Sequence, residues 1–204
     1  MQDDTSAGTG RRGPKGDKRA RTRAALLEAA RELVRERGYE GTTLRGVAER
    51  AGMTSGAIYG NFKNRDDLFL ALGLTYWPPI VPRYRPDATF AEKMRALADA
   101  TIAALPERAR AAPGRLTGMA YALTHESLRA RVHEVTAASY ALGAEWLKSI
   151  ASDAELPMPA EQMVCVIHAL TEGLVFQRLL TPDLVPDEAI YAAFDALARA
   201  SARR

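Results

Sequence analysis

The sequence has a single cysteine, Cys165, among its 204 residues, so no disulfide bond can form within the chain. This excludes a small secreted domain held together by disulfides and favours a reducing compartment. The chain also lacks an uncharged apolar run of about 18 residues, and Asp3 and Asp4 stand where a secretory leader would have basic residues. We therefore expect a cytoplasmic protein with no membrane segment.

The sequence has no large excess of either charge, but its charges are unevenly distributed. The formal net charge is +3; residues 1–75 hold 14 basic and 10 acidic side chains, and the remainder holds 14 and 15. The basic side chains cluster between Arg11 and Arg23, where only Asp17 opposes them. Such a cluster suits a polyanion such as nucleic acid, although a solvated charged tail fits the charge equally well. Residues 1–17 lack an apolar period, so we expect a disordered basic arm.

Strand-like alternation between turn signals is absent from the sequence, which predicts an all-α fold. Leu26, Ala30, Leu33 and Val34 recur at helical spacing and predict a first helix from Lys18 to a stop at Gly38. Further helical segments are expected at residues 43–51, 54–61, 64–77, 89–105, 114–124, 127–152, 159–180 and 186–202. Thr42 and Thr43 can cap the second helix and Asn64 the fourth, Thr89 and Glu92 can form a capping box, and a proline stands near the first turn of each of the last two helices.

The segment from Thr43 to Asn61 has the spacing of a helix-turn-helix. Two short helices cross closely where the facing residue is small and the turn residue accepts a left-handed backbone, and Ala48 and Gly52 meet these needs. Ile58 can then pack the second helix onto the first. Taken alone, this spacing fits an ordinary helical hairpin as well.

The flanking residues add a dense pattern over residues 20–72. Together they resemble the amino-terminal domain of the TetR family of bacterial transcriptional regulators, through Gly38-Tyr39, Gly41-Thr42-Thr43-Leu44, Val47-Ala48, Ala51-Gly52, Gly56-Ala57-Ile58-Tyr59, Asn61-Phe62-Lys63-Asn64 and Asp67-Leu68-Phe69. The resemblance implies an all-α protein with a three-helix DNA-binding domain at residues 18–65. A fourth helix would link it to a helical ligand-binding and dimerisation domain at residues 66–204.

The resemblance also implies which residues contact DNA. A recognition helix beginning near Thr54 would reach base edges through Thr54 and Ser55, and Gly56 and Ala57 would permit close approach and contact with a thymine methyl. The expected DNA-binding residues are Thr43, Arg45, Thr54, Ser55, Gly56, Ala57, Tyr59, Asn61, Lys63 and Arg65. Tyr59 can equally be a core aromatic, and Arg45 a solvated surface residue.

The sequence departs from the commoner family pattern at Gly60 and Asn61, where a bulky aromatic residue and a histidine are frequent. Glycine weakens a helix by about 1 kcal/mol relative to alanine, so the end of the recognition helix is expected to be less rigid. Asn61 keeps a polar contact possible.

The family resemblance implies a homodimer built on the last two helices. Their apolar residues allow this, because the helix at 159–180 is apolar on more than one side, and Gly173 suggests close helix approach. The expected interface residues are Met163, Ile167, Leu170, Leu174, Ile190, Phe194 and Leu197. The alternative is that these stripes only cover the core of their own domain.

A small-molecule site in the carboxy-terminal domain is also implied by the resemblance. The candidates combine aromatic bulk with a few polar groups, as ligand pockets do. They are Tyr76, Trp77, Met94, Met119, Tyr121, His125, Tyr140, Trp146, His168, Glu172 and Phe176. Each of them taken singly can instead be a core residue. His168 and Glu172 lie one helical turn apart and could face a cavity together or bind each other.

Enzymes are the main competing class. The three histidines show no metal-ligand spacing with cysteines or carboxylates, and no phosphate-binding loop or nucleophile motif is present. Cys165 is flanked by Val164 and Val166, which predicts a buried, inert thiol. We therefore expect no enzymatic activity, no metal and no cofactor. A helical ligand-binding protein that ignores DNA would leave the basic cluster without a use.

These expectations combine into one hypothesis. A homodimeric repressor binds a palindromic double-stranded operator, and a small-molecule effector releases it. The helix from Asn64 to Trp77 would couple the two domains, because it begins beside the DNA-binding residues and ends at the candidate ligand site.

Overall fold

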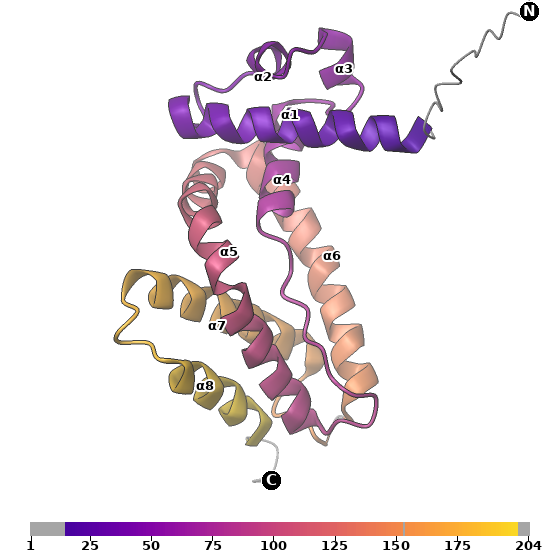
Figure 1. Cartoon of the computed structure of the whole chain (residues 1–204). Coiled ribbons are helices and arrows are strands. Elements are labelled where there is room, and N and C mark those ends of the chain that lie inside the picture. The colour runs from indigo at the N-terminus through magenta and orange to yellow at the C-terminus, as the bar shows by residue number, and fades with distance from the viewer. Residues whose placement is uncertain (1–14, 153, 200–204) are drawn as a thin grey trace, which may run out of the picture. The chain divides into compact units, whose positions relative to one another are not determined.

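The computed structural model describes residues 15–152 and 154–199, and every regular element in this part of the chain is an α-helix. The described residues divide into two compact units, one ending at Leu68 and the other beginning at Phe69. The all-α class predicted from the sequence is confirmed (Figure 1). Most of the predicted basic arm lies outside the described residues; its last three residues, Lys15 to Asp17, belong to the first helix.

The first unit consists of α1 (Lys15–Arg37), α2 (Leu44–Arg50), α3 (Ser55–Tyr59) and the start of α4 (Arg65–Tyr76). The helix α2 packs against both α1 and α3 (Figure 1). The predicted apolar stripe of α1 is buried, as are Val47 and Ala48 of α2 and Ile58 of α3. The first three helices are thus held together by the residues that the sequence pattern selected.

Local signals place the ends of these helices. The α1 helix ends where Gly38 adopts a φ of 70°, and Gly52 adopts a φ of 64° after α2. Both values lie in the left-handed region that side chains with a Cβ rarely enter. The side chain of Asn64 accepts a hydrogen bond from the Asp67 backbone N–H at 2.8 Å, so Asn64 caps α4 as expected.

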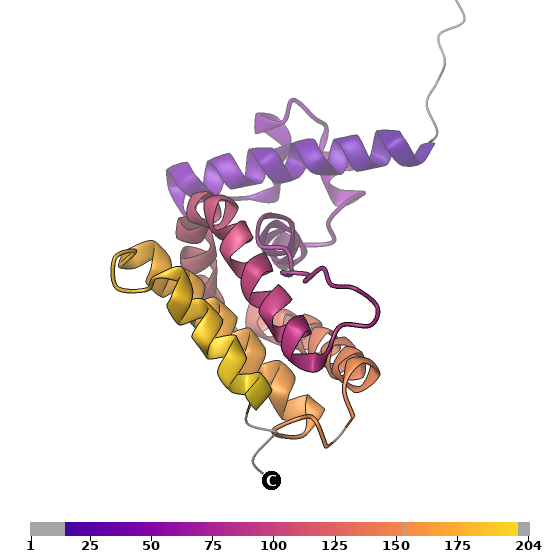
Figure 2. The ribbon, with the colours of Figure 1, turned by 60° about the horizontal axis from the view of Figure 1, so that its bottom comes forward.

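The second unit contains α5 (Phe90–Thr124), α6 (Glu126–Ile150), α7 (Ala160–Leu180) and α8 (Asp187–Arg199). The helix α5 packs against the other three, and α6 also packs against α7 (Figure 2). The capping box predicted at the start of α5 is present, with Thr89 and Glu92 bonded to each other's backbone N–H groups. The core combines residues of all four helices, among them Met94, Leu147, Met163, Ile190 and Phe194.

The helix α5 corrects one prediction. The sequence suggested two helices separated near residues 105–114, where Pro106 and Pro113 lie, but α5 runs through both prolines. Proline removes one backbone hydrogen bond and typically ends or kinks a helix. Here the buried positions Thr101, Arg108 and Ala112 continue the helical spacing set by Phe90 and Met94, so tertiary packing outweighs the local signal.

Candidate functional sites

The helix-turn-helix has a capping threonine at the start of each helix. The Thr43 Oγ1 accepts from the Gly46 N–H at 3.0 Å, and the Thr54 Oγ1 accepts from the Ala57 N–H at 3.3 Å. Both threonines are exposed, and each hydroxyl keeps its own proton for a further partner. The two residues therefore hold the helix starts and still offer a hydrogen-bond donor to the outside.

The other predicted recognition residues lie mainly at the surface of the first unit. Ser55, Gly56 and Lys63 are exposed, Ala57 is half-buried, and the Tyr59 side chain is 59% exposed. Tyr59 is therefore a surface aromatic and not the core residue that the sequence left as an alternative. Arg45 is exposed as well, and its guanidinium pairs with Glu49 at 2.8 Å, which raises the pKa of Arg45.

The protein's own packing does not require glycine at position 56. A Cβ at this position would meet only the Thr54 Oγ1, at 3.8 Å, which is ordinary van der Waals contact. The backbone at Gly56 is also exposed and has a negative φ. Nothing within the described fold therefore demands glycine here, and close approach of DNA at Gly56 stays a prediction.

The recognition helix is shorter than predicted. It ends at Tyr59 with Gly60 as its cap, so Asn61 lies beyond it. The Asn61 side-chain amide donates to the Ala57 carbonyl at 2.8 Å, which ties it to the end of α3. One of the two N–H bonds of the Asn61 amide is thus used inside the unit, and a contact from Asn61 to DNA stays a prediction.

Two arginines of α1 also bind the segment after α3. Arg23 donates to the Asn61 carbonyl at 3.0 Å and stacks over the Phe62 ring, 4.5 Å from its centroid. Arg19 donates to the Gly60 carbonyl at 3.5 Å. Sequence analysis counted these arginines only as part of the basic cluster. Their positive charges lie at the carbonyl end of α3, where cations are favourable.

Arg65 also has a role that the sequence did not indicate. Its guanidinium donates to the Tyr39 carbonyl and lies 3.6 Å from a carboxylate oxygen of Glu40. These contacts tie the start of α4 to the connection after α1. The side chain is only one-third exposed, so Arg65 acts first as a structural clamp, and a phosphate contact from it stays a prediction. Lys63 has no side-chain contact of this kind among the described hydrogen bonds and ion pairs, and it remains a better candidate for a phosphate.

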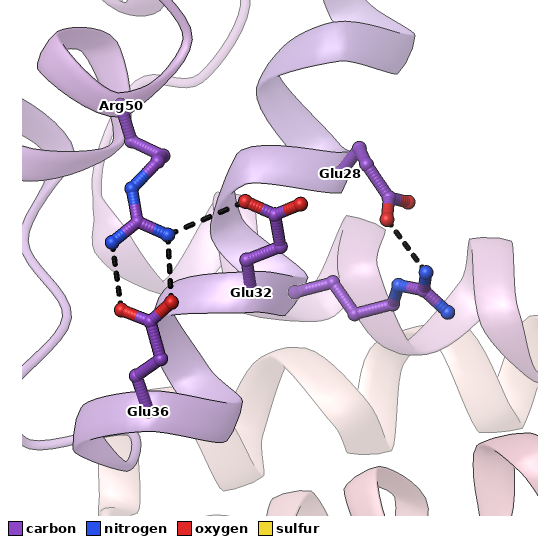
Figure 3. A network of polar contacts seen from close by, with 5 residues as sticks. Glu28, Glu32, Glu36 and Arg50 are labelled. Carbon is purple, nitrogen blue, oxygen red and sulfur yellow. Dashed lines mark hydrogen bonds and ion pairs between the residues drawn. The ribbon is translucent and has the colours of Figure 1, made fainter.

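A charge network joins α1 to α2. Figure 3 shows Arg50 of α2 facing Glu32 and Glu36, which lie one turn apart on α1. Arg50 forms two parallel bonds to Glu36, at 2.9 and 2.6 Å, and one to Glu32 at 3.3 Å. The bidentate bond lowers the pKa of Glu36 and raises that of Arg50. The network fixes the angle of the first helix of the motif through a geometry that lysine could not reproduce.

The second unit brings together three of the predicted ligand-site residues. Trp77 stacks on Phe176 with ring centroids 5.3 Å apart, and its indole N–H donates to the Glu172 Oε1. Two arginines of α5 complete this group: Arg108 and Arg115 lie 4.3 and 5.7 Å from the Trp77 ring centroid. We call these five residues the Trp77 cluster.

Sequence analysis missed both arginines of the Trp77 cluster. The prolines at 106 and 113 were read as helix breaks, which removed the helical spacing that places Arg108, Ala112 and Arg115 on one face. Continuing the helix through these prolines would have exposed the signal, because a basic residue on the buried face of a helix is rare.

The remaining candidates for the ligand site are dispersed. Tyr121 stacks on His125, Tyr140 donates to or accepts from His168 at 2.7 Å, and the Trp146 indole donates to the hydroxyl of Tyr84. Tyr76 is half-buried at the end of α4. Two methionines do not fit the predicted ligand site, for opposite reasons. Met94 is fully buried in the core, and Met119 is exposed. His168 and Glu172 do not bind each other but have separate partners.

The predicted dimer residues need a correction. Met163, Ile190 and Phe194 are fully buried in the core of their own chain, so they have no surface left to bury against a second chain. Ile167, Leu174 and Leu197 are partly buried against that same core, and Leu170 is half-buried. A Cβ at Gly173 would meet nothing within 4 Å, whereas one at Gly143 would lie 2.4 Å from Val164 Cγ2. The close approach of helices therefore occurs at Gly143.

The outer face of α7 is apolar and uncovered in this structure. Cys165, Val166, Ala169 and Gly173 are exposed, which contradicts the buried thiol expected for Cys165. By length and composition alone, α7 could cross a membrane, and 17% of its most apolar 18-residue stretch is buried. Within the described residues, no group of three His, Cys, Asp or Glu side chains could hold a metal ion.

Comparison with known proteins points to regulators of transcription. Residues 26–72 match the family described as bacterial regulatory proteins, tetR family. The repressor AcnR of Corynebacterium glutamicum is 46% identical over 57 residues, which is 28% of this chain and 30% of AcnR. The regulator TtgR of Pseudomonas putida is 49% identical over 51 residues, 25% of this chain and 24% of TtgR. The matched segments thus span less than a third of these relatives.

Solved structures extend the likeness to most of the chain. NalD, the secondary repressor of the MexAB-OprM multidrug efflux pump in Pseudomonas aeruginosa, is 25% identical, with a TM-score of 0.57 over 87% of this chain and 93% of NalD. A second transcriptional regulator from Pseudomonas aeruginosa has a TM-score of 0.65 at 19% identity and covers 94% of both chains, which shows the shared fold.

Proposed function

We propose that the protein is a transcriptional repressor, because residues 26–72 match the family described as bacterial regulatory proteins, tetR family, and because the repressor AcnR is 46% identical over 57 residues. It binds a palindromic double-stranded operator as a homodimer and is released by a small-molecule effector. The observation that supports this best is the exposed helix-turn-helix, whose capping threonines and recognition residues lie at the surface. We assign residues 18–65 to DNA binding and residues 66–204 to effector binding and dimerisation.

The proposed contacts divide into base and phosphate contacts. Ser55, Gly56 and Ala57, with the hydroxyl of Thr54, would face the base edges when α3 enters a major groove. Thr43, Tyr59 and Lys63 would bind phosphates from either side, with smaller contributions from Asn61 and Arg65. Arg45 bonds Glu49 through Nε alone, so its two Nη groups would remain available for a guanine.

Dimerisation is proposed because one α3 of five residues offers few contacts to DNA. Two copies related by a twofold axis would contact two half-sites of a palindrome. We propose that the outer face of α7 forms this interface, through Val166, Ala169 and Gly173, because an exposed apolar helix face favours burial. The half-buried residues Ile167, Leu170, Leu174 and Leu197 would contribute at its edge, and α8 would lie beside it.

Effector control is proposed to act through α4. This helix contains Arg65, which is clamped to the connection after α1, and ends one residue before Trp77 of the Trp77 cluster. An effector that changes the position of α4 would change the separation of two recognition helices, which must match the spacing of major grooves. A repressor of this kind acts in the cytoplasm and needs no catalytic group or cofactor.

The test of this function is binding to duplex DNA at several salt concentrations, followed by selection of the preferred sequence from a random library. Release of counterions predicts that the affinity falls steeply as salt rises. Lys63→Ala should reduce the slope of log affinity against log salt by about 1 without changing the preferred sequence, whereas Ser55→Ala should change base preference. Arg83→Ala, at an exposed arginine of the second unit, is the matched control and should leave both unchanged. A chain that ignores duplex DNA even at low salt is not this repressor.

A further inference from the structure

The Trp77 cluster contains more buried positive charge than negative charge. Its charged members are Arg108, Arg115 and Glu172, and the first of these has only 4% of its surface exposed. The side chains of Arg115 and Glu172 are 27% and 18% exposed. The cluster thus contains two guanidinium groups and one carboxylate, and its net charge is +1. Glu107, the next acidic residue along α5, is exposed to solvent.

Both oxygens of the Glu172 carboxylate already accept a hydrogen bond within the cluster. The Glu172 Oε1 accepts from the Trp77 indole, and its Oε2 accepts from Arg115 Nη2 at 3.2 Å. Arg108 donates through Nη2 to the carbonyl of Pro78, which is a neutral acceptor. No carboxylate is therefore bonded to Arg108, although its guanidinium is the most deeply buried in the described part of the chain.

Two N–H groups of the cluster point at no acceptor. Arg108 Nη1 and Arg115 Nε are both buried and have no hydrogen-bond partner. Buried donors in native proteins are nearly always satisfied, so each such group needs an explanation. An arginine side chain stays protonated in proteins, so losing a proton cannot remove the unpaired donors. Burial is the largest influence on the pKa of Arg108 and lowers it, which reflects the cost of holding an uncompensated charge there.

We propose that the Trp77 cluster binds the carboxylate of a small organic acid, and that organic acids are the effector class of the repressor proposed above, on which the second half of this inference rests. Guanidinium groups match carboxylates in shape and charge, and the two unpartnered N–H groups are the donors that such a ligand needs. The bound anion would bring the charge of the cluster to zero. The same indole ring, within 6 Å of both guanidinium groups, ties the site to the residue that follows α4.

The binding experiment uses the full-length protein and isothermal titration calorimetry at constant ionic strength. Acetate, benzoate and decanoate are each compared with the neutral amide of the same carbon chain, which keeps the shape and removes the charge. We expect at least one carboxylate to bind at least tenfold more tightly than its amide. If no carboxylate in this series binds better than its amide, the anion site is disproved, and the two donors are satisfied by water.

Three variants then test the assigned residues. Arg108→Met removes the unpaired charge at similar length and should weaken the carboxylate at least tenfold, whereas Glu172→Gln removes the competing negative charge and should tighten it severalfold. Arg110→Met, at an exposed arginine two positions along α5, is the matched control and should match the wild type. Thermal unfolding checks each fold. If Arg108→Met does not fold, Glu172→Gln decides, because a cluster that only stabilises the fold predicts no gain in anion affinity.

The effector role is measured separately, by fluorescence anisotropy on operator DNA with and without the carboxylate. Release of DNA by the carboxylate, but not by its amide, supports the effector class. A carboxylate that binds the cluster and leaves DNA bound overturns the effector role while the anion site stands. Failure of the ligand-free wild type to bind any duplex overturns the repressor function instead, so the two failures are distinguishable.

Discussion

Gly56 and Gly41 show how differently two glycines of one unit are constrained. A Cβ at Gly41 would lie 2.6 Å from the Arg37 carbonyl oxygen, so the fold itself requires glycine at that position. A Cβ at Gly56 would make one ordinary contact, so the fold does not require glycine there. A single methyl group added at Gly56 can therefore test DNA binding separately from the stability of the fold.

Gly56→Ala is expected to keep or raise stability and to weaken DNA binding. Alanine favours a helix over glycine by about 1 kcal/mol, and the added methyl has room within the protein. On DNA the same methyl would hold the backbone of α3 away from the base edges, and we expect at least a tenfold loss of operator affinity. Thermal unfolding and fluorescence anisotropy measure the two effects.

The matched control for this change is Gly73→Ala in α4. A Cβ at Gly73 would meet nothing within 4 Å, so this variant should show a similar gain in helix stability. Its operator affinity should stay that of the wild type, since Gly73 is not among the proposed DNA contacts. Equal affinities for the two variants would mean that α3 does not approach DNA at Gly56.

At the scale of the element, the close approach of α6 and α7 depends on one position. A Cβ at Gly143 would lie 2.4 Å from Val164 Cγ2, and valine is a branched side chain with few alternative rotamers. A salt bridge from Lys148 to Glu161, at 2.8 Å, joins the same two helices and lowers the pKa of Glu161. Both observations indicate that these helices are fixed against each other along one side.

Gly143→Ala is therefore expected to destabilise the protein by about 1–3 kcal/mol, the usual cost of overpacking. Gly114→Ala, in α5, provides the comparison, because a Cβ there would meet nothing within 4 Å and should cost no stability. Denaturant unfolding followed by circular dichroism measures both. A Gly143→Ala protein as stable as the wild type would show that Val164 can move away freely.

At the scale of the whole molecule, the outer face of α7 is an apolar surface that the described part of the chain leaves exposed. Three residues expected at the dimer interface, Met163 of α7 and Ile190 and Phe194 of α8, cover the core of their own unit instead. The exposed set of Val166, Ala169 and Gly173 is left as the apolar surface of this helix. If the protein is the dimeric repressor proposed above, this apolar surface is where we expect the second copy to bind.

Val166→Glu and Gly173→Glu are expected to shift the protein from dimer to monomer without unfolding it, because both positions are exposed in the single chain. Buried glutamates facing each other across a twofold axis would be strongly unfavourable. Sedimentation velocity at micromolar concentration measures the effect. Leu142→Glu on α6 is the control, since Leu142 is 74% exposed and lies outside the proposed face. A dimer that persists in both glutamate variants would place the interface elsewhere.

Sequence reasoning succeeded where the signal was local. The capping residues Thr43, Asn64 and Thr89 act on backbone groups within three residues, so their function follows from spacing alone. It failed for α5, where a strong local signal against a helix competes with buried residues that lie far apart in the chain. The candidate ligand site was found only in part for this reason, since both of its arginines lie in the segment that was misread.

The sequence by itself determined the helical class, several caps, the helix-turn-helix and the resemblance of the amino-terminal region to the TetR family, because each depends on residues close together along the chain. The tertiary structure decided which apolar residues fill the core of the second unit and which stay at the surface, and it placed two arginines beside one glutamate. The bond between Arg115 and Glu172, for example, joins α5 to α7 across 57 residues of the chain. Helical periodicity reports one face of one helix and contains no information about which other helix that face meets.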